Sequence, residues 1–106
     1  MVVRKAGAVV LTKTNVGHSL MISETINHLW GRTLNPYNRS LTTGASSGGE
    51  AALIGFHGSP LGFGTDIAGS IRVPAARVTI SILKALHLYL GSVVYTACDR
   101  LMEECR

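Results

Sequence analysis

Short apolar runs separated by turns set the pattern of this 106-residue chain. An apolar run covers residues 6–11, but it is short and no cleavage site follows, so it is not a convincing signal peptide. Residues 17–35 mix polar positions with apolar ones that can pack inward, which predicts a helix followed by a loop. A helix is predicted over 50–56, directly after two glycines, and a strand over 59–64.

The stretch from Gly44 to Pro74 has the most constrained composition of the chain. It holds eight of the twelve glycines and four serines. Glycine permits positive φ and close approach of another group, so a serine among glycines can stand on a sharp turn beside converging backbone N–H groups. A nucleophile and an oxyanion hole are two parts of an acyl-transfer site. A flexible Gly/Ser linker is disfavoured, because the stretch also contains the apolar run Ala51–Ile54.

Composition excludes several other classes. Ten Lys/Arg against six Asp/Glu give a formal charge of +4, but the basic residues are scattered, so nucleic-acid binding is not expected. Cys98 and Cys105 fit no metal spacing and predict reduced thiols in a cytoplasmic protein. His18 and His28 lie ten positions apart without an acidic or cysteine partner at ligand spacing, so no metal site is expected.

Two runs in the glycine-rich stretch carry a family resemblance. Gly44–Glu50 (GASSGGE) and Gly64–Pro74 (GTDIAGSIRVP) resemble the signature block of the amidase signature family. Within the family, they resemble most the branch of acetamidases and fatty-acid amide hydrolases. Ser46 and Ser70 are 24 positions apart, as in the family pattern. The resemblance implies an α/β fold, a twisted mixed β-sheet core covered by helices, of which this chain holds a central piece. It also implies a small-molecule or acyl amide substrate and no cofactor.

The family hydrolyses carboxamides through an acyl-enzyme with a Ser–cis-Ser–Lys triad. On matching positions, Ser70 resembles the nucleophile and Ser46 the bridging serine, with a cis peptide bond from Ala45 into Ser46. A neutral lysine takes the proton of the nucleophile through the bridging serine. The oxyanion hole of the family corresponds to the backbone N–H groups of Ile67, Ala68, Gly69 and Ser70.

The catalytic lysine has no counterpart at a matching position. In the family it lies further ahead of the serine pair than the 45 residues that precede Ser46. Lys5 and Lys13 precede the block, but neither sits in the lysine motif, and Lys13 is expected to be a solvated or capping residue. Two hypotheses therefore stand: a serine amidase, and a catalytically inactive fragment that retains only a structural or ligand-binding role.

The resemblance also assigns neighbouring segments. Residues 8–11 match a parallel strand of the family, and residues 14–16 would then lie at its carboxyl end, where α/β sheets gather binding loops. Asp66 and Arg72 flank the Ser70 turn and are expected to brace it without reacting.

Beyond Ala76 the resemblance stops. We expect a partial amidase signature domain over 1–76 and a divergent tail over 77–106. The tail could be a helix, an amphipathic surface segment or sequence from a changed splice or reading frame, and the last is favoured. Its apolar part, 78–97, falls short of a membrane span of about 20 predominantly apolar residues.

A rival motif overlaps the block. Gly44–Gly48 also satisfies the G-x-S-x-G nucleophile elbow of α/β-hydrolases, in which Ser46 would attack, with Asp66 and His87 following in the correct order. No run of β-branched or aromatic residues precedes Gly44 as that motif requires. The longer amidase pattern therefore outweighs the elbow.

Overall fold

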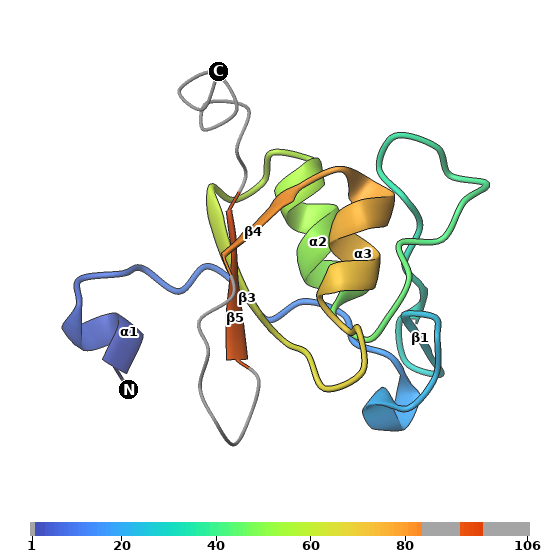
Figure 1. The fold of residues 1–106 in the computed structure, drawn as a ribbon, viewed down its shortest axis with the longest axis horizontal. Helices are drawn as coiled ribbons and strands as arrows, with labels where there is room; N and C mark the ends of the chain where they lie inside the picture. Colours follow the sequence, from blue (N-terminus) through green and yellow to red (C-terminus); the bar gives the residue numbers. More distant parts are fainter. Residues whose placement is uncertain (1, 84–91, 97–106) are drawn as a thin grey trace.

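The computed structural model describes residues 2–83 and 92–96. Its elements are α1 (Val2–Lys5), a 3-10 turn η1 (His18–Leu20), β1 (Ile26–Asn27), β2 (Gly31–Arg32), α2 (Gly48–Gly55), β3 (Leu61–Thr65), α3 (Arg72–Val78), β4 (Ser81–Leu83) and β5 (Ser92–Thr96) (Figure 1). The chain is of the α/β class, as the family resemblance implies, and its described strand pairs are antiparallel where the resemblance implies a mixed sheet.

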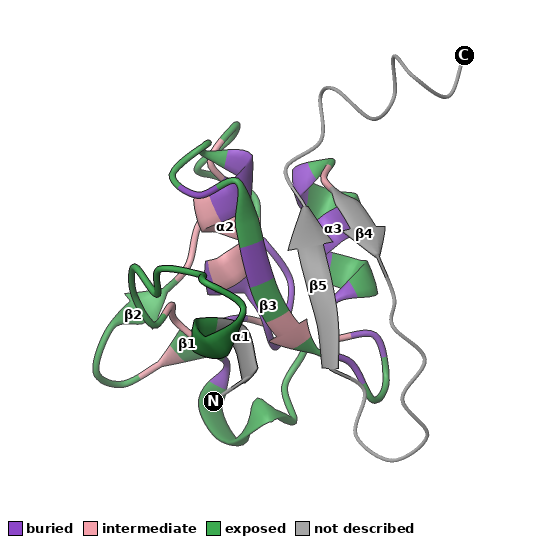
Figure 2. Cartoon of the chain, turned by 90° about the vertical axis from the view of Figure 1, so that its left-hand side faces the viewer, coloured by how far each residue is buried: buried purple, intermediate pink, exposed green. Residues whose placement is uncertain are grey.

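A three-stranded antiparallel sheet lies beside the two main helices. Its strand order is β3-β5-β4, and Val94 in β5 is aligned with Phe63 on one side and Leu83 on the other. Helices α2 and α3 lie together on one side of this sheet, whereas α1 lies on the other (Figure 1). Strands β1 and β2 form a separate two-stranded antiparallel ladder. Figure 2 shows buried residues concentrated in α2, α3 and part of β3.

The core lies between α2 and α3. Its buried side chains are Ala51, Ile54, Ile71, Ala75 and Val78, and Ile80 packs against them. The helices approach so closely that a Cβ atom on Gly55 would lie 2.2 Å from Cγ1 of Val78. Glycine at this position therefore permits the helix contact that holds both serine turns in place.

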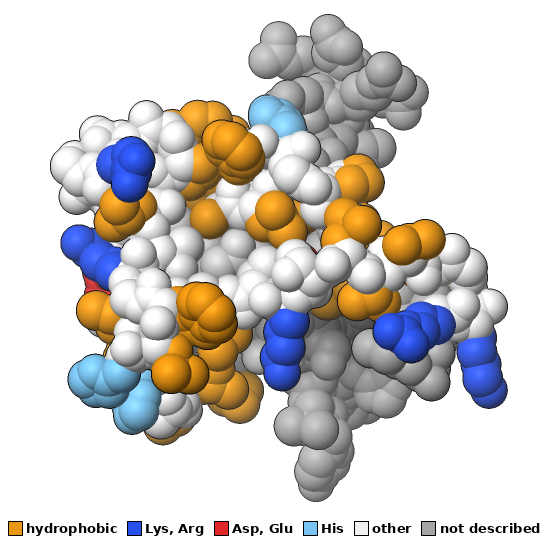
Figure 3. Space-filling view, turned by 180° about the vertical axis from the view of Figure 1, so that it is seen from behind, with side chains coloured by type: hydrophobic (Ala, Val, Ile, Leu, Met, Phe, Trp, Pro, Cys, Tyr) orange, Lys and Arg blue, Asp and Glu red, His pale blue; other side chains and the backbone are white. Residues whose placement is uncertain are grey.

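Large apolar side chains remain uncovered elsewhere. Met21, Leu29, Trp30 and Ile67 are exposed by 86%, 86%, 79% and 87%. Figure 3 shows apolar side chains spread over the face opposite to that of Figure 1. The described core is therefore small for the apolar content of the chain. Uncovered apolar area of this kind is typical of surfaces that pack against further protein.

Two sequence predictions of elements are confirmed. Helix α2 covers the predicted helix over 50–56 except its last residue, and begins two residues earlier, at Gly48. Strand β3 overlaps the strand predicted over 59–64. Helix α3 follows the Ser70 turn and has no counterpart among the predicted elements.

Two other predictions are wrong. Residues 8–11 are not in a strand, because none of the described strands pairs with them. Residues 17–35 do not begin with a long helix: Ser19 and Leu20 have φ angles of 52° and 62°, which end the helical turn after three residues. Asn27 then closes the β1–β2 turn, since its Oδ1 accepts hydrogen bonds from the N–H groups of Leu29 and Trp30.

The C-terminal part is described only in part. Residues 84–91 and 97–106 lie outside the described residues, and His87, Cys98 and Cys105 are among them. Helix α3 crosses the predicted boundary after Ala76 and ends at Val78, and the division into two segments stays a prediction. Among the described helices, none has the length and apolar content that a bilayer crossing requires.

Candidate active site

The first serine turn runs from Gly44 into α2. Gly44 has a φ of +79°, a conformation that favours glycine, and the Ala45–Ser46 peptide bond is cis, as the family resemblance implies. Ser46 is buried, with 3% of its surface exposed. Its carbonyl oxygen accepts a hydrogen bond of 3.2 Å from the N–H of Gly17. The turn is therefore fixed against the segment that precedes β1.

Thr25 holds both ends of this turn and is a residue that sequence reasoning missed. Its side chain is fully buried. Oγ1 donates to the carbonyl oxygen of Gly44 at 2.7 Å and accepts from the N–H of Gly48 at 2.9 Å. A Cβ atom on Gly48 would lie 2.4 Å from this oxygen, so glycine is needed there. No local signal marks Thr25, because its partners lie about twenty residues away in the sequence.

The second serine turn is organised by the carboxylate of Asp66. Oδ1 accepts a hydrogen bond from the N–H of Gly69 at 2.8 Å, and Oδ2 accepts from the N–H groups of Ile71 and Arg72 at 3.1 and 3.0 Å. These donors lie on both sides of Ser70. Gly69 has a φ of +121°, which only glycine adopts readily. Asp66 and Arg72 thus brace the turn, as the family resemblance implies.

The same carboxylate forms a forked ion pair with the side chain of Arg72. Nε and Nη2 of Arg72 donate to Oδ2 and Oδ1 at 3.1 and 2.9 Å. The side chain of Asp66 is 1% exposed and that of Arg72 is 57% exposed. The Arg72 guanidinium, together with the backbone donors, holds the pKa of Asp66 well below its usual range, although burial opposes this shift. Asp66 is therefore ionised and fully engaged.

The two serine turns meet through backbone contacts. The N–H of Ser47 donates to the carbonyl oxygen of Ser70 at 3.2 Å, and Oγ of Ser47 donates to the carbonyl oxygen of Thr65 at 3.4 Å. The structure thus brings together residues that are 24 positions apart in the sequence, Ser46 and Ser70, on two touching turns. Within the described part of the chain, their two hydroxyl groups form no direct hydrogen bond with each other.

The loop before Ser70 exposes several backbone donors. Among the described residues, the N–H groups of Ile67, Ala68 and Ser70 have no protein acceptor, whereas that of Gly69 is occupied by Asp66. Unpaired N–H groups beside a serine are the donors that an oxyanion requires.

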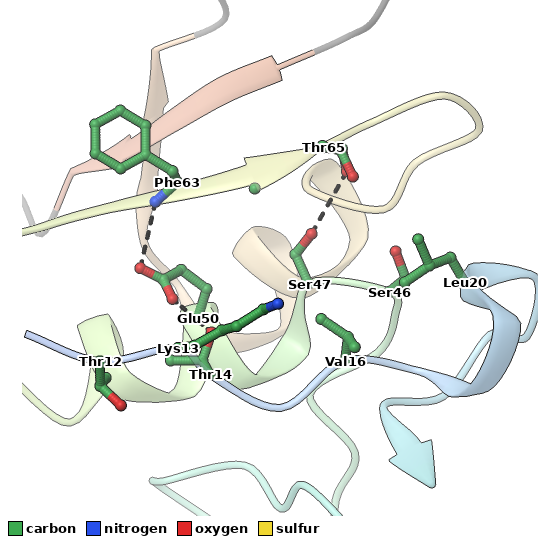
Figure 4. A pocket seen from close by; sticks show the side chains of 11 residues that line it. Thr12, Lys13, Thr14, Val16, Leu20, Ser46, Ser47, Glu50, Phe63 and Thr65 are labelled. Carbon is green, nitrogen blue, oxygen red and sulfur yellow. Dashed lines mark hydrogen bonds between the residues drawn. The ribbon is translucent and has the colours of Figure 1, made fainter. Parts of the chain in front are cut away.

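A cavity of about 300 Å³ opens beside the first turn. Its walls come from residues 12–14, Val16, Leu20, the Ser46–Ser47 turn, Glu50 and the end of β3 (Figure 4). Ser46 therefore faces an open space, whereas Ser70 is not one of the lining residues.

Glu50 fastens two walls of this cavity to each other. One carboxylate oxygen accepts a hydrogen bond of 2.6 Å from Oγ1 of Thr14, and the other accepts one of 3.3 Å from the N–H of Phe63. The side chain of Lys13 extends along the cavity (Figure 4). Lys13 is exposed, which agrees with the solvated lysine that the sequence predicts.

The geometry weighs against the elbow hypothesis. That motif needs an acid that orients a histidine, yet both oxygens of Asp66 are bonded to Arg72 and to backbone donors of its own loop. His87, the proposed histidine, lies outside the described residues. In residues 2–83 and 92–96, no cluster of three or more His, Cys, Asp or Glu side chains is arranged to hold a metal ion.

Comparison with known proteins identifies the family. The sequence model of the Amidase family matches residues 1–87. The chain belongs to the amidase family. An acetamidase of Emericella nidulans is 56% identical over 100 residues, and a putative amidase of Curvularia clavata is 54% identical over 91 residues. These matches cover 94% and 86% of this chain.

Solved structures agree with this assignment. A 6-aminohexanoate cyclic dimer hydrolase bound to its substrate superimposes with a TM-score of 0.81 over 90% of this chain, at 29% identity. A fatty acid amide hydrolase superimposes with a TM-score of 0.64 over 77% of the chain, at 34% identity. The amidase chain covers 18% and 16% of the two curated relatives and 23% and 17% of these two structures.

Proposed function

We propose that this amidase chain carries the serine pair of a hydrolase that cleaves a carboxamide to an acid and an amine. The observation that supports this most directly is the contact between the two serine turns, Ser47 N–H to Ser70 carbonyl at 3.2 Å, next to the cis bond into Ser46. The turns belong to different segments, so this contact sets the position of Ser70 relative to Ser46.

In the proposed reaction, Oγ of Ser70 attacks the amide carbonyl carbon, and its proton passes through the hydroxyl of Ser46 to a neutral lysine, the base that the family resemblance implies and assigns to none of the residues of this sequence. The carbonyl oxygen becomes an oxyanion, for which the N–H groups of Ile67, Ala68 and Ser70 are available donors. The C–N bond then breaks, the departing amine takes up the proton that Ser70 released, and an ester on Ser70 remains. Water hydrolyses this ester and regenerates the hydroxyl group.

Gly69 has a different role in this scheme from the one that the family pattern implies. Its N–H donates to Asp66 at 2.8 Å, and the remaining proposed donors of the oxyanion hole have no such acceptor among the described residues. Gly69 therefore shapes the hole through its backbone conformation, while its neighbours supply the hydrogen bonds.

The alternative is a catalytically inactive fragment. The chain spans 16–18% of the length of these two curated relatives, and the family resemblance assigns the catalytic lysine to none of the residues of this sequence. The uncovered side chains of Leu29, Trp30 and Ile67 fit a polypeptide that packs against further amidase sequence. Under this alternative the serine turns are formed but lack a base to activate them.

An assay of hydrolysis separates the two proposals. The purified chain is incubated with short and long acyl amides, and the released acid is measured for the wild type and for Ser70→Ala. Release that disappears in the variant supports the hydrolase. An equal, background rate in both proteins supports the inactive fragment.

A further inference from the structure

We propose that His18 and His28 form a two-imidazole site for a divalent first-row transition metal ion, such as Cu²⁺ or Zn²⁺. Their ring centroids lie 5.8 Å apart with an interplanar angle of 72°. Figure 3 shows histidine side chains in contact on the surface of the molecule. Ten sequence positions separate them, a spacing that predicts no metal site, but Asn27, the residue before His28, donates a hydrogen bond of 3.0 Å to the carbonyl oxygen of Val16, two residues before His18, and so holds the two segments together.

The spacing of the rings suits coordination of one ion. Imidazole nitrogen binds Zn²⁺ at about 2.0–2.1 Å, so two rings that share an ion have centroids roughly 4.5–6 Å apart. The observed separation of 5.8 Å falls in this range. The rings stand edge to face, and because both residues are exposed, their side chains are free to rotate from this arrangement so that one nitrogen of each ring binds the same ion. Neutral imidazole is a preferred ligand of Cu²⁺, Ni²⁺ and Zn²⁺.

Water would complete the coordination sphere. Among the described residues, no third His, Cys, Asp or Glu joins the pair in a cluster, and nearby Glu24 is engaged in an ion pair with Arg32 at 2.8 Å. A site with two protein ligands and open positions binds an ion reversibly, unlike a closed structural zinc site. The site is therefore suited to a loosely held ion.

The location links such an ion to the cavity. His18 follows Gly17, whose N–H donates to the carbonyl oxygen of Ser46, and precedes Leu20, which lines the cavity. Ser19 and Leu20 both have positive φ, a strained conformation for residues other than glycine. An ion shared with His28 would tie this strained turn to the β1–β2 ladder. Metal binding would thereby stiffen the wall beside Ser46.

Calorimetric titration with CuSO₄ and ZnCl₂ tests the site without reference to amide hydrolysis. All proteins carry Cys98→Ser and Cys105→Ser, because thiolates also bind these ions. In this background His18→Asn and His28→Asn each remove one ligand, and His57→Asn is the matched control. His57 has a φ of 60°, which asparagine tolerates well.

We expect one ion per chain, with binding weakened about tenfold or more in each site variant and unchanged within about twofold in the control. Selective broadening of the ring NMR signals of His18 and His28 by substoichiometric Cu²⁺ provides a second measurement on the protein with both histidines intact. A titration that shows no saturable binding at ion concentrations up to about 1 mM would overturn the proposal, because a dissociation constant above that value is too weak for a specific site. Equal losses in the His57 variant, or broadening of other rings first, would also overturn it.

Discussion

Asp66 accepts a forked pair of hydrogen bonds from Arg72, at 3.1 Å from Nε and 2.9 Å from Nη2, while its carboxylate also binds backbone donors on both sides of Ser70. Charge-assisted bonds of this forked kind are geometrically specific. The position of Ser70 is therefore set by a buried acid that takes no part in the proposed reaction.

Replacing Asp66 with asparagine should lower the free energy of unfolding by about 3 kcal/mol, because a buried charged acceptor of several hydrogen bonds is lost. Chemical denaturation of both proteins at neutral pH measures the difference. Arg72→Lys is the matched control: it keeps the positive charge, loses the forked geometry and should cost less.

The destabilisation by Asp66→Asn should depend on pH. The folded state lowers the pKa of Asp66, whereas the unfolded chain takes up this proton near pH 3.9, so the stabilisation is complete above about pH 5 and is lost as the pH falls further. The stability difference between wild type and variant should therefore shrink between about pH 5 and pH 3. A difference that stays constant over this range would contradict the ionised, bonded state of Asp66.

Thr25 should be essential to the first serine turn. Thr25→Val removes the hydroxyl that donates to Gly44 and accepts from Gly48, and leaves buried backbone groups unpaired at a cost of about 2 kcal/mol. Thr25→Ser keeps the hydroxyl and is the control. Thermal unfolding followed by circular dichroism should show a clear drop for valine and a smaller one for serine. Equal effects would assign the role of Thr25 to packing of its methyl group.

The two serines should differ in an amide hydrolysis assay. Ser70→Ala should abolish activity, because it removes the attacking oxygen, whereas Ser46→Ala should slow the reaction strongly and leave a measurable rate. The initial rates of the two variants and the wild type decide the ranking. The reverse order would favour the elbow hypothesis, in which Ser46 attacks.

Lys13 should be dispensable for chemistry. It lines the cavity but is exposed, so Lys13→Ala should keep any amide hydrolysis within a few-fold of the wild type. Lys5→Ala, at the end of α1, is the control for loss of a positive charge. Complete loss of the hydrolysis rate in the Lys13 variant alone would make Lys13 the base.

The parts of the site that were predictable from sequence are those with local signals. Gly44 and Gly69 mark turns that need positive φ, and the apolar run after Gly49 indicates a helix. The positions of the two serine turns and of helix α2 could therefore be predicted from the sequence. The bracing role of Asp66 was implied by the family resemblance, and its backbone donors lie three to six residues away.

The parts that were missed depend on contacts distant in sequence. Thr25 reaches Gly44 across 19 positions, and His18 and His28, whose rings contact each other, lie ten positions apart in the sequence. Residues 8–11 have the composition of a strand, but a strand forms only beside a partner, and none of the described strands supplies one. Local composition carries no information on these partners.

The most direct test of the account is intact-mass analysis of the chain after reaction with a fluorophosphonate, which bonds to activated serine hydroxyl groups. We predict one adduct per wild-type chain and none in Ser70→Ala. An adduct that persists in Ser70→Ala but disappears in Ser46→Ala would contradict the assignment of the nucleophile. A wild-type chain without any adduct would contradict an activated Ser70 and would support the alternative that this chain is a catalytically inactive fragment.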